Sequence, residues 1–359
     1  MQNTGVLRKG GSMTQIKVSV ITPIYNRRQF IDSMYACLAS QTLPDIEFLI
    51  IDDCSTDGTF EKLSELLKKD HRFVLLRAEQ NSGPSACRNL ALQQATGEYI
   101  GFFDSDDIIP ADYFANLYQI GCDNNADIIY TNYNDVKHII PNIQSECDKF
   151  KSLRNGALWD KLYRAKHLQQ HQLSFSEGLY CADNIFVIKA FYFASNIILC
   201  DYPRYQYALH TDSIGKDKHK MQKRKQDIIT VCRIILNFAD RQNIAGETLR
   251  SIKKFLARSF NEYKHDKQFR QNLAQVLGIN IEEDTMTNYV EKHSRAIKLF
   301  FFLPIYGWKQ RGGRKTWKIL GLPVFTRRQM SNGITTKYYI LGIPVMKVSN
   351  KLSKMIFYV

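Results

Sequence analysis

The chain has 359 residues, of which 44% are apolar, and this length and composition exclude a disordered chain and leave room for a large core plus an appendage. The net charge of +14 is concentrated at one end, because residues 291–359 carry 14 Lys and Arg and a single acid, Glu291. The first 290 residues are nearly neutral, so the basic charge predicts a partner of the C-terminal end rather than the substrate of the main domain.

The eight cysteines are scattered and form no C-x-x-C pair, which argues against a zinc or redox motif and fits a reducing cytoplasm. The N-terminal residues lack the apolar segment of a signal peptide. No apolar run has the length of a membrane-spanning helix. We therefore expect a cytoplasmic protein.

Apolar runs rich in β-branched residues predict buried strands at 17–22, 47–51, 73–76 and 99–103. Helical periodicity between them predicts helices at 28–41, 59–69 and 85–95. This alternation predicts an α/β fold with a mostly parallel sheet covered by helices on both faces. Ligands bind beyond the carboxyl ends of strands in such sheets, so residues 23–26, 52–53 and 104–106 are expected to share one rim.

The later part of the chain has a different composition and periodicity. Residues 216–277 are polar and read as helical, with an apolar seam that includes Ile228 and Ile235. Further on, Ile319–Val324 returns as Ile340–Val345, and two copies predict two similar strand-turn pieces rather than a repeat architecture. We predict four regions: a flexible N-terminus (1–16), the α/β domain (17–215), a helical region (216–290) and a basic, aromatic-rich extension (291–359).

Three carboxylates, Asp104, Asp106 and Asp107, directly follow the fourth predicted strand. Asp106 or Asp107 could cap a helix at 111–117, with Pro110 near its first turn. Alternatively, a divalent cation would neutralise the cluster, and Mg²⁺ or Mn²⁺ binds hard oxygens, including those of phosphate.

Four ordered segments surround this cluster: Val18–Asn26 (VSVITPIYN), Ile50–Thr59 (IIDDCSTDGT), Asn81–Asn89 (NSGPSACRN) and Gly97–Asp107 (GEYIGFFDSDD). Together they resemble the family 2 glycosyltransferases of the GT-A fold, over roughly residues 18–213. The resemblance implies a Rossmann-like, mixed but mostly parallel sheet. It also implies a nucleotide-sugar donor, Mn²⁺ or Mg²⁺ as cofactor, and usually inversion at the anomeric carbon.

The resemblance implies nucleotide contacts by Pro23, Tyr25, Asp53, Asn81, Gly83, Arg88 and Asp104. The Tyr25 ring would stack on the base, or else pack at the strand end. Asp53 would accept from a uracil N–H, which favours UDP, or else form an Asx-turn. Arg88 would pair either with a phosphate or with an acid of the rim.

The same resemblance implies that Asp104 and Asp106 hold the metal and that His210 adds a contact to it. Asp183 matches the general base that takes the proton of the acceptor hydroxyl, although Ala182 stands where the family usually has a second acid. Asp183 could also cap a helix at 184–194.

Residues Leu158–Arg164 (LWDKLYR) resemble the family's Trp-Asn-Lys-Leu-Tyr-Arg stretch, with Asp160 in place of Asn. Trp159 and Lys161 are therefore predicted to bind the acceptor. A lone Trp is, however, more often part of a core.

The predicted function is a metal-dependent, inverting glycosyltransferase of the hexosyltransferase type, acting from a UDP-sugar. Its acceptor would be an oligosaccharide or lipid-linked glycan of a lipopolysaccharide, lipooligosaccharide or capsule. Cations interleaved with aromatics in residues 291–359 predict peripheral attachment to the anionic inner face of the cell membrane. Four alternatives remain. The first is an enzyme of the same fold with a different carrier or metal need, and the second is an inactive nucleotide-binding module. The third is nucleic-acid binding through the extension, for which no fold signature appears, and the fourth is a solvated basic surface that contacts another copy of the chain.

Overall fold

The structure is a computed structural model that describes residues 15–131, 143, 145–153, 155–200, 218–260, 263 and 265–279, together with six strands between 308 and 357. The chain divides into two compact units, 1–284 and 285–359. Within the described residues, no helix is both long enough and apolar enough to cross a bilayer. The predicted limits of the four regions stay predictions.

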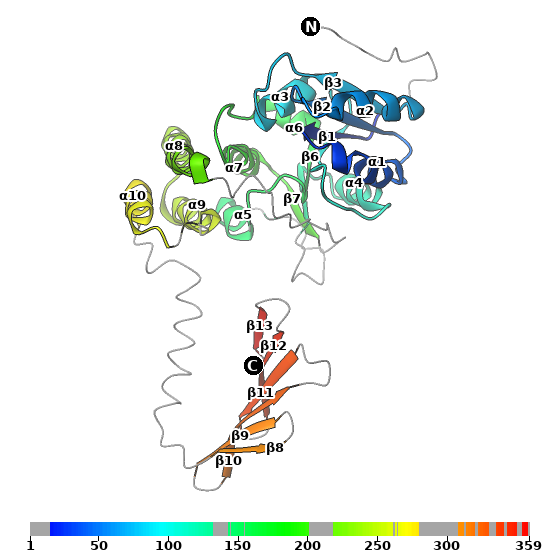
Figure 1. Cartoon of the computed structure of the whole chain (residues 1–359). Helices are drawn as coiled ribbons and strands as arrows, with labels where there is room; N and C mark the ends of the chain where they lie inside the picture. Colours follow the sequence, from blue (N-terminus) through cyan, green and yellow to red (C-terminus); the bar gives the residue numbers. More distant parts are fainter. Residues whose placement is uncertain are drawn as a thin grey trace. The chain divides into compact units, whose positions relative to one another are not determined.

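The first unit is built on a seven-stranded sheet in the order β3-β2-β1-β4-β6-β5-β7 (Figure 1). The strands are β1 Val18–Ile24, β2 Ile46–Asp52, β3 Phe73–Arg77, β4 Tyr99–Phe102, β5 Ile128–Thr131, β6 Lys161–Arg164 and β7 Ile197–Cys200. All neighbours run parallel except at β6, which is antiparallel to both β4 and β5. The predicted mixed, mostly parallel sheet is therefore confirmed.

Helices cover both faces of this sheet. They are α1 Ile31–Ala39, α2 Thr59–Leu66, α3 Pro84–Gln94, α4 Tyr113–Asp123, α5 Glu146–Ser152, α6 Ala165–Gln170, α7 Asp183–Phe193, α8 Lys218–Arg241, α9 Gly246–Ser259 and α10 Lys267–Leu277, with short 3₁₀ turns at Arg28–Phe30 and Leu67–Lys69. One apolar core joins α1, α2 and α4 to the sheet. The other joins α3, α6 and α7 to it and continues into α5 and α8–α10.

The burial of the central strands explains their composition. All seven residues of β2 (IEFLIID) are buried, because helices pack against both faces of a parallel strand. The predicted strands and helices up to residue 103 agree with the structure to within a few residues. The predicted helix at 28–41 is shorter, since a 3₁₀ turn precedes α1.

The predicted cap before residue 111 is wrong. Helix α4 begins at Tyr113 behind Asp112, and no side chain caps it. Neither Asp106 nor Asp107 is close enough in sequence to serve as its N-cap, so the carboxylates after β4 need another explanation.

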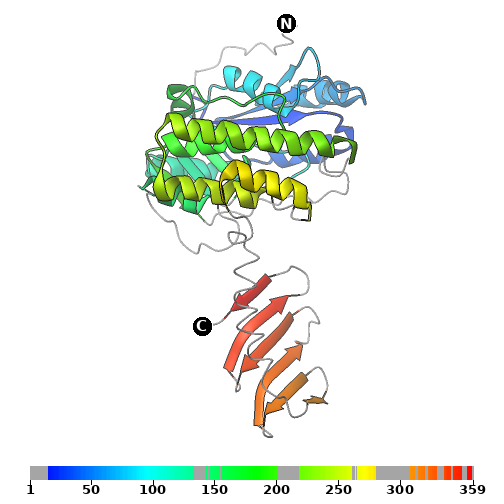
Figure 2. The same ribbon diagram turned by 90° about the vertical axis from the view of Figure 1, so that its left-hand side faces the viewer.

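The helices α8–α10 confirm the helical character predicted for 216–277. Helix α8 packs against α7 and α10, and α9 packs against α5 (Figure 2). Ile228 and Ile235 of the predicted seam are fully buried in the core that α8 shares with α7. The helical region thus belongs to the same compact unit as the sheet.

The second unit contains an antiparallel sheet in the order β13-β12-β11-β10-β9-β8. Its strands are β8 Trp308–Arg311, β9 Arg314–Ile319, β10 Leu322–Gln329, β11 Thr335–Ile340, β12 Ile343–Ser349 and β13 Lys354–Phe357. The two similar sequence segments lie at two hairpins, where Ile319 pairs with Leu322 and Ile340 with Ile343. The predicted pair of strand-turn pieces is therefore confirmed.

Candidate functional site

The polar rim lies at the carboxyl ends of β1, β2 and β4, as the alternation of strands and helices predicts. The backbone N–H of Asp53 donates to the carbonyl of Ile24 at 2.8 Å, which ties the end of β2 to the end of β1. The N–H of Phe103 donates to the carbonyl of Ile21 at 3.1 Å, which ties β4 to β1. The residues that follow these three strands therefore lie side by side.

Tyr25 is exposed at the end of β1, with 44% of its surface accessible. Packing of the ring into the strand end is therefore not what the structure shows. An exposed aromatic ring at this rim leaves a face available for a nucleotide base. Pro23 lies within β1, two residues before Tyr25.

Asp53 is buried and holds the loop that precedes α3. Its two carboxylate oxygens accept from the backbone N–H groups of Ser82 and Gly83, each at 2.8 Å. Gly83 has a φ of +85°, a conformation that favours glycine, and Pro84 follows as the first residue of α3. Asn81 is exposed beside them. The proposed uracil contact of Asp53 stays a prediction, and the structure adds a loop-anchoring role that the sequence did not indicate.

Arg88 is the cation that lies among the carboxylates of the rim. Its Nη1 donates to Oδ1 of Asp183 at 3.0 Å, and its Nη2 lies 3.9 Å from Oδ1 of Asp104. Arg88 is 8% exposed, so these contacts lie in a partly desolvated setting. Of the two partners predicted for Arg88, the structure shows the acids of the rim.

Asp104 carries the clearest electrostatic signature of the site. Burial of the carboxyl group away from water is the main cause that raises the pKa of Asp104, to about 6. The negative charges of Asp183 and Asp106 raise this pKa further, and the positive charge of Arg88 lowers it. Part of the side chain, 39%, is nevertheless exposed. A second cation beside Asp104 and Asp106 would offset the repulsion between their negative charges. A divalent metal ion would therefore suit this position.

The described residues supply few ligands for such a metal. Among the described residues, no group of three or more His, Cys, Asp or Glu side chains is assembled for metal binding. Asp104 and Asp106 suit a Mg²⁺ or Mn²⁺ that completes its coordination with diphosphate oxygens and water. His210, the third predicted ligand, lies outside the described residues.

Asp183 opens helix α7, and its predicted capping role is wrong. The helix begins at Asp183 itself, Ala182 is the N-cap, and no side chain caps the helix. The preceding Cys181 has a φ of +60°, a left-handed conformation that turns the chain into the helix. Asp183 therefore stands at a sharp turn on the rim, with its carboxylate held by Arg88.

The ring of Phe175 packs against the guanidinium of Arg88, a contact that the sequence did not indicate. The guanidinium lies 5.5 Å from the centre of the Phe175 ring, which in turn stacks on Phe186 of α7 at 4.2 Å. The side chain of Asn89 accepts from the N–H of Phe175 at 2.8 Å and donates to Glu177 at 2.8 Å. Adjacent residues of α3 thus hold both Asp183 and the loop that leads toward it.

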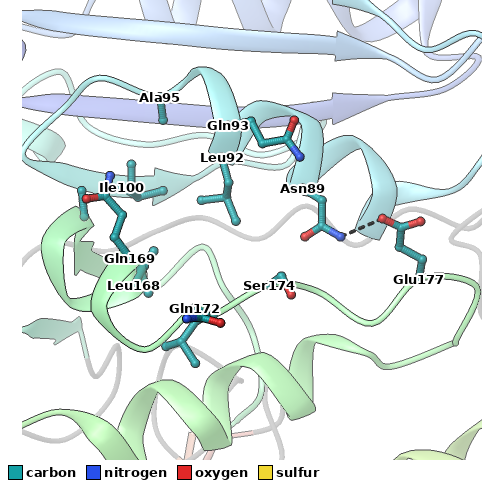
Figure 3. Close-up of a pocket in the computed structure, with 12 residues that line it drawn as sticks. Asn89, Leu92, Gln93, Ala95, Ile100, Leu168, Gln169, Gln172, Ser174 and Glu177 are labelled. Atoms are coloured by element: carbon teal, nitrogen blue, oxygen red, sulfur yellow. Dashed lines mark hydrogen bonds between the residues drawn. The ribbon is translucent and has the colours of Figure 1, made fainter.

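A pocket of about 360 Å³ lies between α3 and the segment 165–177 (Figure 3). Apolar side chains, among them Leu92 and Leu168, line it together with Asn89, Gln93 and Glu177. None of Asp104, Asp106 and Asp183 lines it, so this pocket is not the carboxylate site. Asn89 and Glu177 are hydrogen-bonded across its edge (Figure 3).

Lys161 is buried and paired inside the core, so the structure does not support its predicted role in binding the acceptor. It is 1% exposed, and its ammonium donates to Asp160 at 2.7 Å, to the carbonyl of Ala157 at 2.7 Å and to Asn155 at 3.3 Å. Burial raises the pKa of Asp160 and lowers that of Lys161, against their mutual attraction. Trp159 is half-buried against the core of α1 and α4, so the structure supports a packing role for it.

Helix α8 holds the loop that leads into Asp183. Asp227 accepts from the N–H of Tyr180 at 3.1 Å, and Lys223 donates to the carbonyl of Gly178 at 3.2 Å and to Asp227 at 2.8 Å. The guanidinium of Arg224, 4% exposed, lies 5.2 Å from the centre of the Tyr180 ring. Periodicity indicated that this stretch is a helix, but no local signal indicated that it contacts the rim.

Comparisons with known proteins agree with this geometry. A family model described as "Glycosyl transferase family 2" matches residues 19–173. The putative glycosyltransferase EpsH of Bacillus subtilis is 31% identical over 216 residues, which make up 55% of this chain and 62% of that protein. The poly(ribitol-phosphate) beta-N-acetylglucosaminyltransferase TarS of Staphylococcus aureus is 29% identical over 230 residues, 61% of this chain and 40% of that protein. The chain spans between 32% and 64% of the length of such curated relatives.

Solved structures establish the fold. The crystal structure of S. aureus TarS 1–349 in complex with UDP-GlcNAc has a TM-score of 0.57 at 21% identity, covering 84% of this chain and 96% of that one. The mannosyltransferase PcManGT from Pyrobaculum calidifontis, in complex with GDP-Man and Mn²⁺, has a TM-score of 0.52 at 16% identity, covering 81% of this chain and 82% of that one. The predicted GT-A architecture is therefore confirmed.

Proposed function

Because residues 19–173 match the model of glycosyl transferase family 2, we propose that the chain moves a sugar from a UDP-sugar to a hydroxyl of a growing bacterial surface glycan. The observation that carries this proposal is the pairing of Arg88 with both Asp104 and Asp183. It brings the carboxylate predicted for the metal side and the carboxylate predicted as base to one guanidinium.

On the donor side, the exposed ring of Tyr25 would stack on the uracil base, and the loop anchored by Asp53 would border the nucleotide. Asp104 and Asp106 would hold Mn²⁺ or Mg²⁺, which supplies positive charge to the diphosphate and so makes UDP a better leaving group. UDP as carrier is supported by the TarS complex with UDP-GlcNAc, although PcManGT holds GDP-Man.

On the acceptor side, Asp183 takes the proton of the attacking hydroxyl. The hydroxyl oxygen forms a bond to the anomeric carbon, while the bond from that carbon to the diphosphate breaks and leaves its electron pair on UDP. One displacement of this kind inverts the anomeric centre. Arg88 holds the Asp183 carboxylate in a fixed orientation, through the hydrogen bond from its Nη1 to Oδ1.

The surface glycan, whether lipopolysaccharide, lipooligosaccharide or capsule, is a proposal from the family resemblance. It is supported by relatives whose names describe surface polymers, such as TarS. Peripheral attachment at the inner face of the cell membrane stays a prediction from the composition of residues 291–359.

A UDP-release assay tests the proposal. The purified chain is incubated with Mn²⁺, an oligosaccharide acceptor and, in turn, UDP-Glc, UDP-Gal, UDP-GlcNAc and UDP-GalNAc. We expect one donor to be turned over, Asp183→Asn to lower the rate by about 100-fold or more, and Asp106→Ala to remove the stimulation by metal. Asp123→Asn, an exposed acid on α4, is the matched control and should leave the rate unchanged.

The alternative of an inactive nucleotide-binding module predicts a different pattern. Wild-type protein would bind UDP with Mn²⁺ yet release none from any donor. That result would overturn the transferase proposal while leaving the nucleotide site intact.

A further inference from the structure

The pocket between α3 and the segment 165–177 is lined by both apolar and polar side chains (Figure 3). Its volume of about 360 Å³ lies within the range of roughly 300–1,000 Å³ that small-molecule sites occupy. Leu92, Ile100 and Leu168 belong to the apolar part of the lining. The polar part consists of six side chains from both walls: Asn89, Gln93, Gln169, Gln172, Ser174 and Glu177. The pocket thus has the size of a ligand site, and the chemistry of its lining can indicate the ligand.

Side-chain amides make up most of the polar lining. Each Asn or Gln side chain presents an N–H donor and a carbonyl acceptor side by side. A hydroxyl group is also both a donor and an acceptor, so an amide can form hydrogen bonds with hydroxyls in either direction. A sugar combines several hydroxyls with C–H groups on its ring, and the C–H groups suit the apolar part of the lining. The lining therefore matches a sugar well.

The charges of the lining argue against an anionic ligand. Among the described residues that line the pocket there is one carboxylate, Glu177, and there is no Lys, Arg or His. His171 lies next to Gln172 in the chain, but its ring stacks on the ring of Phe193 at 4.4 Å. The described part of the lining also holds no aromatic ring on which a nucleotide base could stack. A phosphate, an acidic sugar or a base is thus a poor match, and a neutral sugar is a better one.

Gln172 has a backbone conformation that glycine would adopt with less strain, since its φ is +48°. It follows the end of α6, where the N–H of Gln172 donates to the carbonyl of Gln169 at 3.1 Å and the N–H of Leu173 donates to that of Leu168 at 2.9 Å. Glycine is the usual residue at this position of such a helix end, and asparagine is the next. Gln172 instead brings an amide to the pocket at a cost in stability, which favours a role for its side chain in binding.

One edge of the pocket connects to the residues that hold Asp183. Asn89 donates to Glu177 at 2.8 Å and to the carbonyl of Phe175 at 3.0 Å (Figure 3). The preceding residue, Arg88, packs against the ring of Phe175 and donates to Asp183. A ligand that binds at the edge formed by Asn89 and Glu177 would therefore contact the loop that leads to Asp183.

We propose that this pocket binds a neutral sugar unit, with hydrogen bonds between its amides and the sugar hydroxyls. The statement that the sugar belongs to the glycan being elongated rests on the proposed function; the statement that the pocket binds it does not. None of Asp104, Asp106 and Asp183 lines the pocket. In this arrangement the pocket holds a unit of the glycan other than the one whose hydroxyl reacts at Asp183.

The experiment uses the full chain without donor or metal. The methyl β-glycosides of glucose, galactose, N-acetylglucosamine and N-acetylgalactosamine are titrated in turn, with methyl β-glucuronide as a charged probe, and binding is followed by saturation-transfer difference NMR. The pocket variant Gln93→Ala/Gln169→Ala is compared with the control variant Gln94→Ala/Gln170→Ala. Each variant removes one exposed Gln from α3 and one from α6, but only the first pair lines the pocket.

We expect at least one neutral glycoside to bind with a Kd on the order of 1 mM. The pocket variant should weaken this binding by about fivefold or more, because two hydrogen-bonding side chains are lost. The control variant should bind like wild type. Methyl β-glucuronide should bind more weakly than the best neutral glycoside, because the lining offers its carboxylate no cation.

A second pair of variants separates lost binding from unfolding. Gln172→Gly removes an amide of the lining together with the strained conformation, so it should weaken binding and still melt at or above the wild-type temperature. Asn243→Gly makes the same kind of change at an exposed residue between α8 and α9, where φ is +54°. This variant should keep the binding of wild type.

Four results would overturn the inference. They are no saturable binding of any neutral glycoside, equal losses in the pocket variant and its control, tighter binding of methyl β-glucuronide than of every neutral glycoside, and loss of binding in Asp183→Asn. The last result would place the sugar at the carboxylate site, whereas a sugar in the pocket predicts wild-type binding by this variant. Failure here would leave UDP release untouched, and failure of UDP release would leave this binding measurable.

Discussion

Nη1 of Arg88 donates a hydrogen bond to Oδ1 of Asp183 at 3.0 Å, although the two residues are 95 positions apart in the chain. Arg88 comes from the middle of α3 and Asp183 from the first residue of α7, so the pair joins two helices on one face of the sheet. The same guanidinium lies 3.9 Å from Asp104 at the end of β4. The orientation of Asp183, the proposed base, and the charge of Asp104 therefore depend on the same side chain.

Replacing Arg88 by Gln should affect the chemical step more than nucleotide binding. A hydrogen bond to a charged group contributes roughly 1.5–3 kcal/mol, which corresponds to about ten- to a hundredfold in kcat. The Kd for UDP with Mn²⁺ should change little, because the guanidinium contacts carboxylates. Steady-state kinetics and calorimetry on the same samples check this. A weakened UDP affinity with unchanged kcat would instead favour the phosphate contact that the sequence also predicts.

The buried pair Asp160–Lys161 should contribute strongly to stability. Replacing Lys161 by Met leaves a buried carboxylate without its cation, and breaking such pairs costs about 3–5 kcal/mol. The double variant Asp160→Asn/Lys161→Met should recover much of that loss, since no charge then remains unpaired. Urea unfolding followed by circular dichroism measures both. Lys151→Met, which removes an exposed pair with Glu247, is the control and should leave the unfolding free energy nearly unchanged.

Asp104 predicts a conflict between stability and function. Its pKa of about 6 in the folded chain lies above the ordinary value of 3.8, so its contribution to stability is fully present below pH 3.8 and is lost as the pH rises through 6. Asp104→Asn resembles the protonated form, and it should raise the melting temperature of metal-free protein at pH 7.5. The gain should shrink as the pH falls below 6.

The same variant should lose the stabilisation that Mn²⁺ with UDP gives to wild type. Thermal melts across pH, with and without these ligands, check both statements. A melting temperature that falls at pH 7.5 in Asp104→Asn would mean that the charged carboxylate is favourable where it lies.

Helix α8 should influence catalysis through the loop 178–182. Asp227→Asn weakens the hold on the Tyr180 N–H and on Lys223, interactions worth about 0.5–1.5 kcal/mol each. We expect kcat to fall by roughly three- to tenfold with little change in UDP affinity. Asp240→Asn, an exposed acid on the same helix, should match wild type. Equal activity of both variants would show that α8 does not position the loop that carries Asp183.

Strand and helix identities in the first unit were predictable because buried parallel strands are apolar throughout and the intervening helices have one apolar face. The rim was predictable for the same reason, since alternation of strands and helices places all strand ends together. The family motifs then singled out Asp104, Asp106 and Asp183, and the structure places these three carboxylates near one another.

The contacts that individual side chains make were harder to predict from the sequence. Arg88 had two acceptable kinds of partner, and only the structure shows that it contacts Asp183 and Asp104. Lys161 lies in a motif that suggests contact with the acceptor, yet Asp160 and Asn155 satisfy its charge inside the core. In the second unit, the alternation of residues cannot specify which strands pair, so the strand order is known only from the structure.

The most direct test of the central claim is a calorimetric titration of UDP into the purified wild-type chain, with and without Mn²⁺. A rim that joins a metal to a nucleotide diphosphate predicts UDP binding that strengthens markedly with Mn²⁺ and loses this dependence in Asp106→Ala. Wild-type heats that are absent, or identical with and without Mn²⁺, would contradict it.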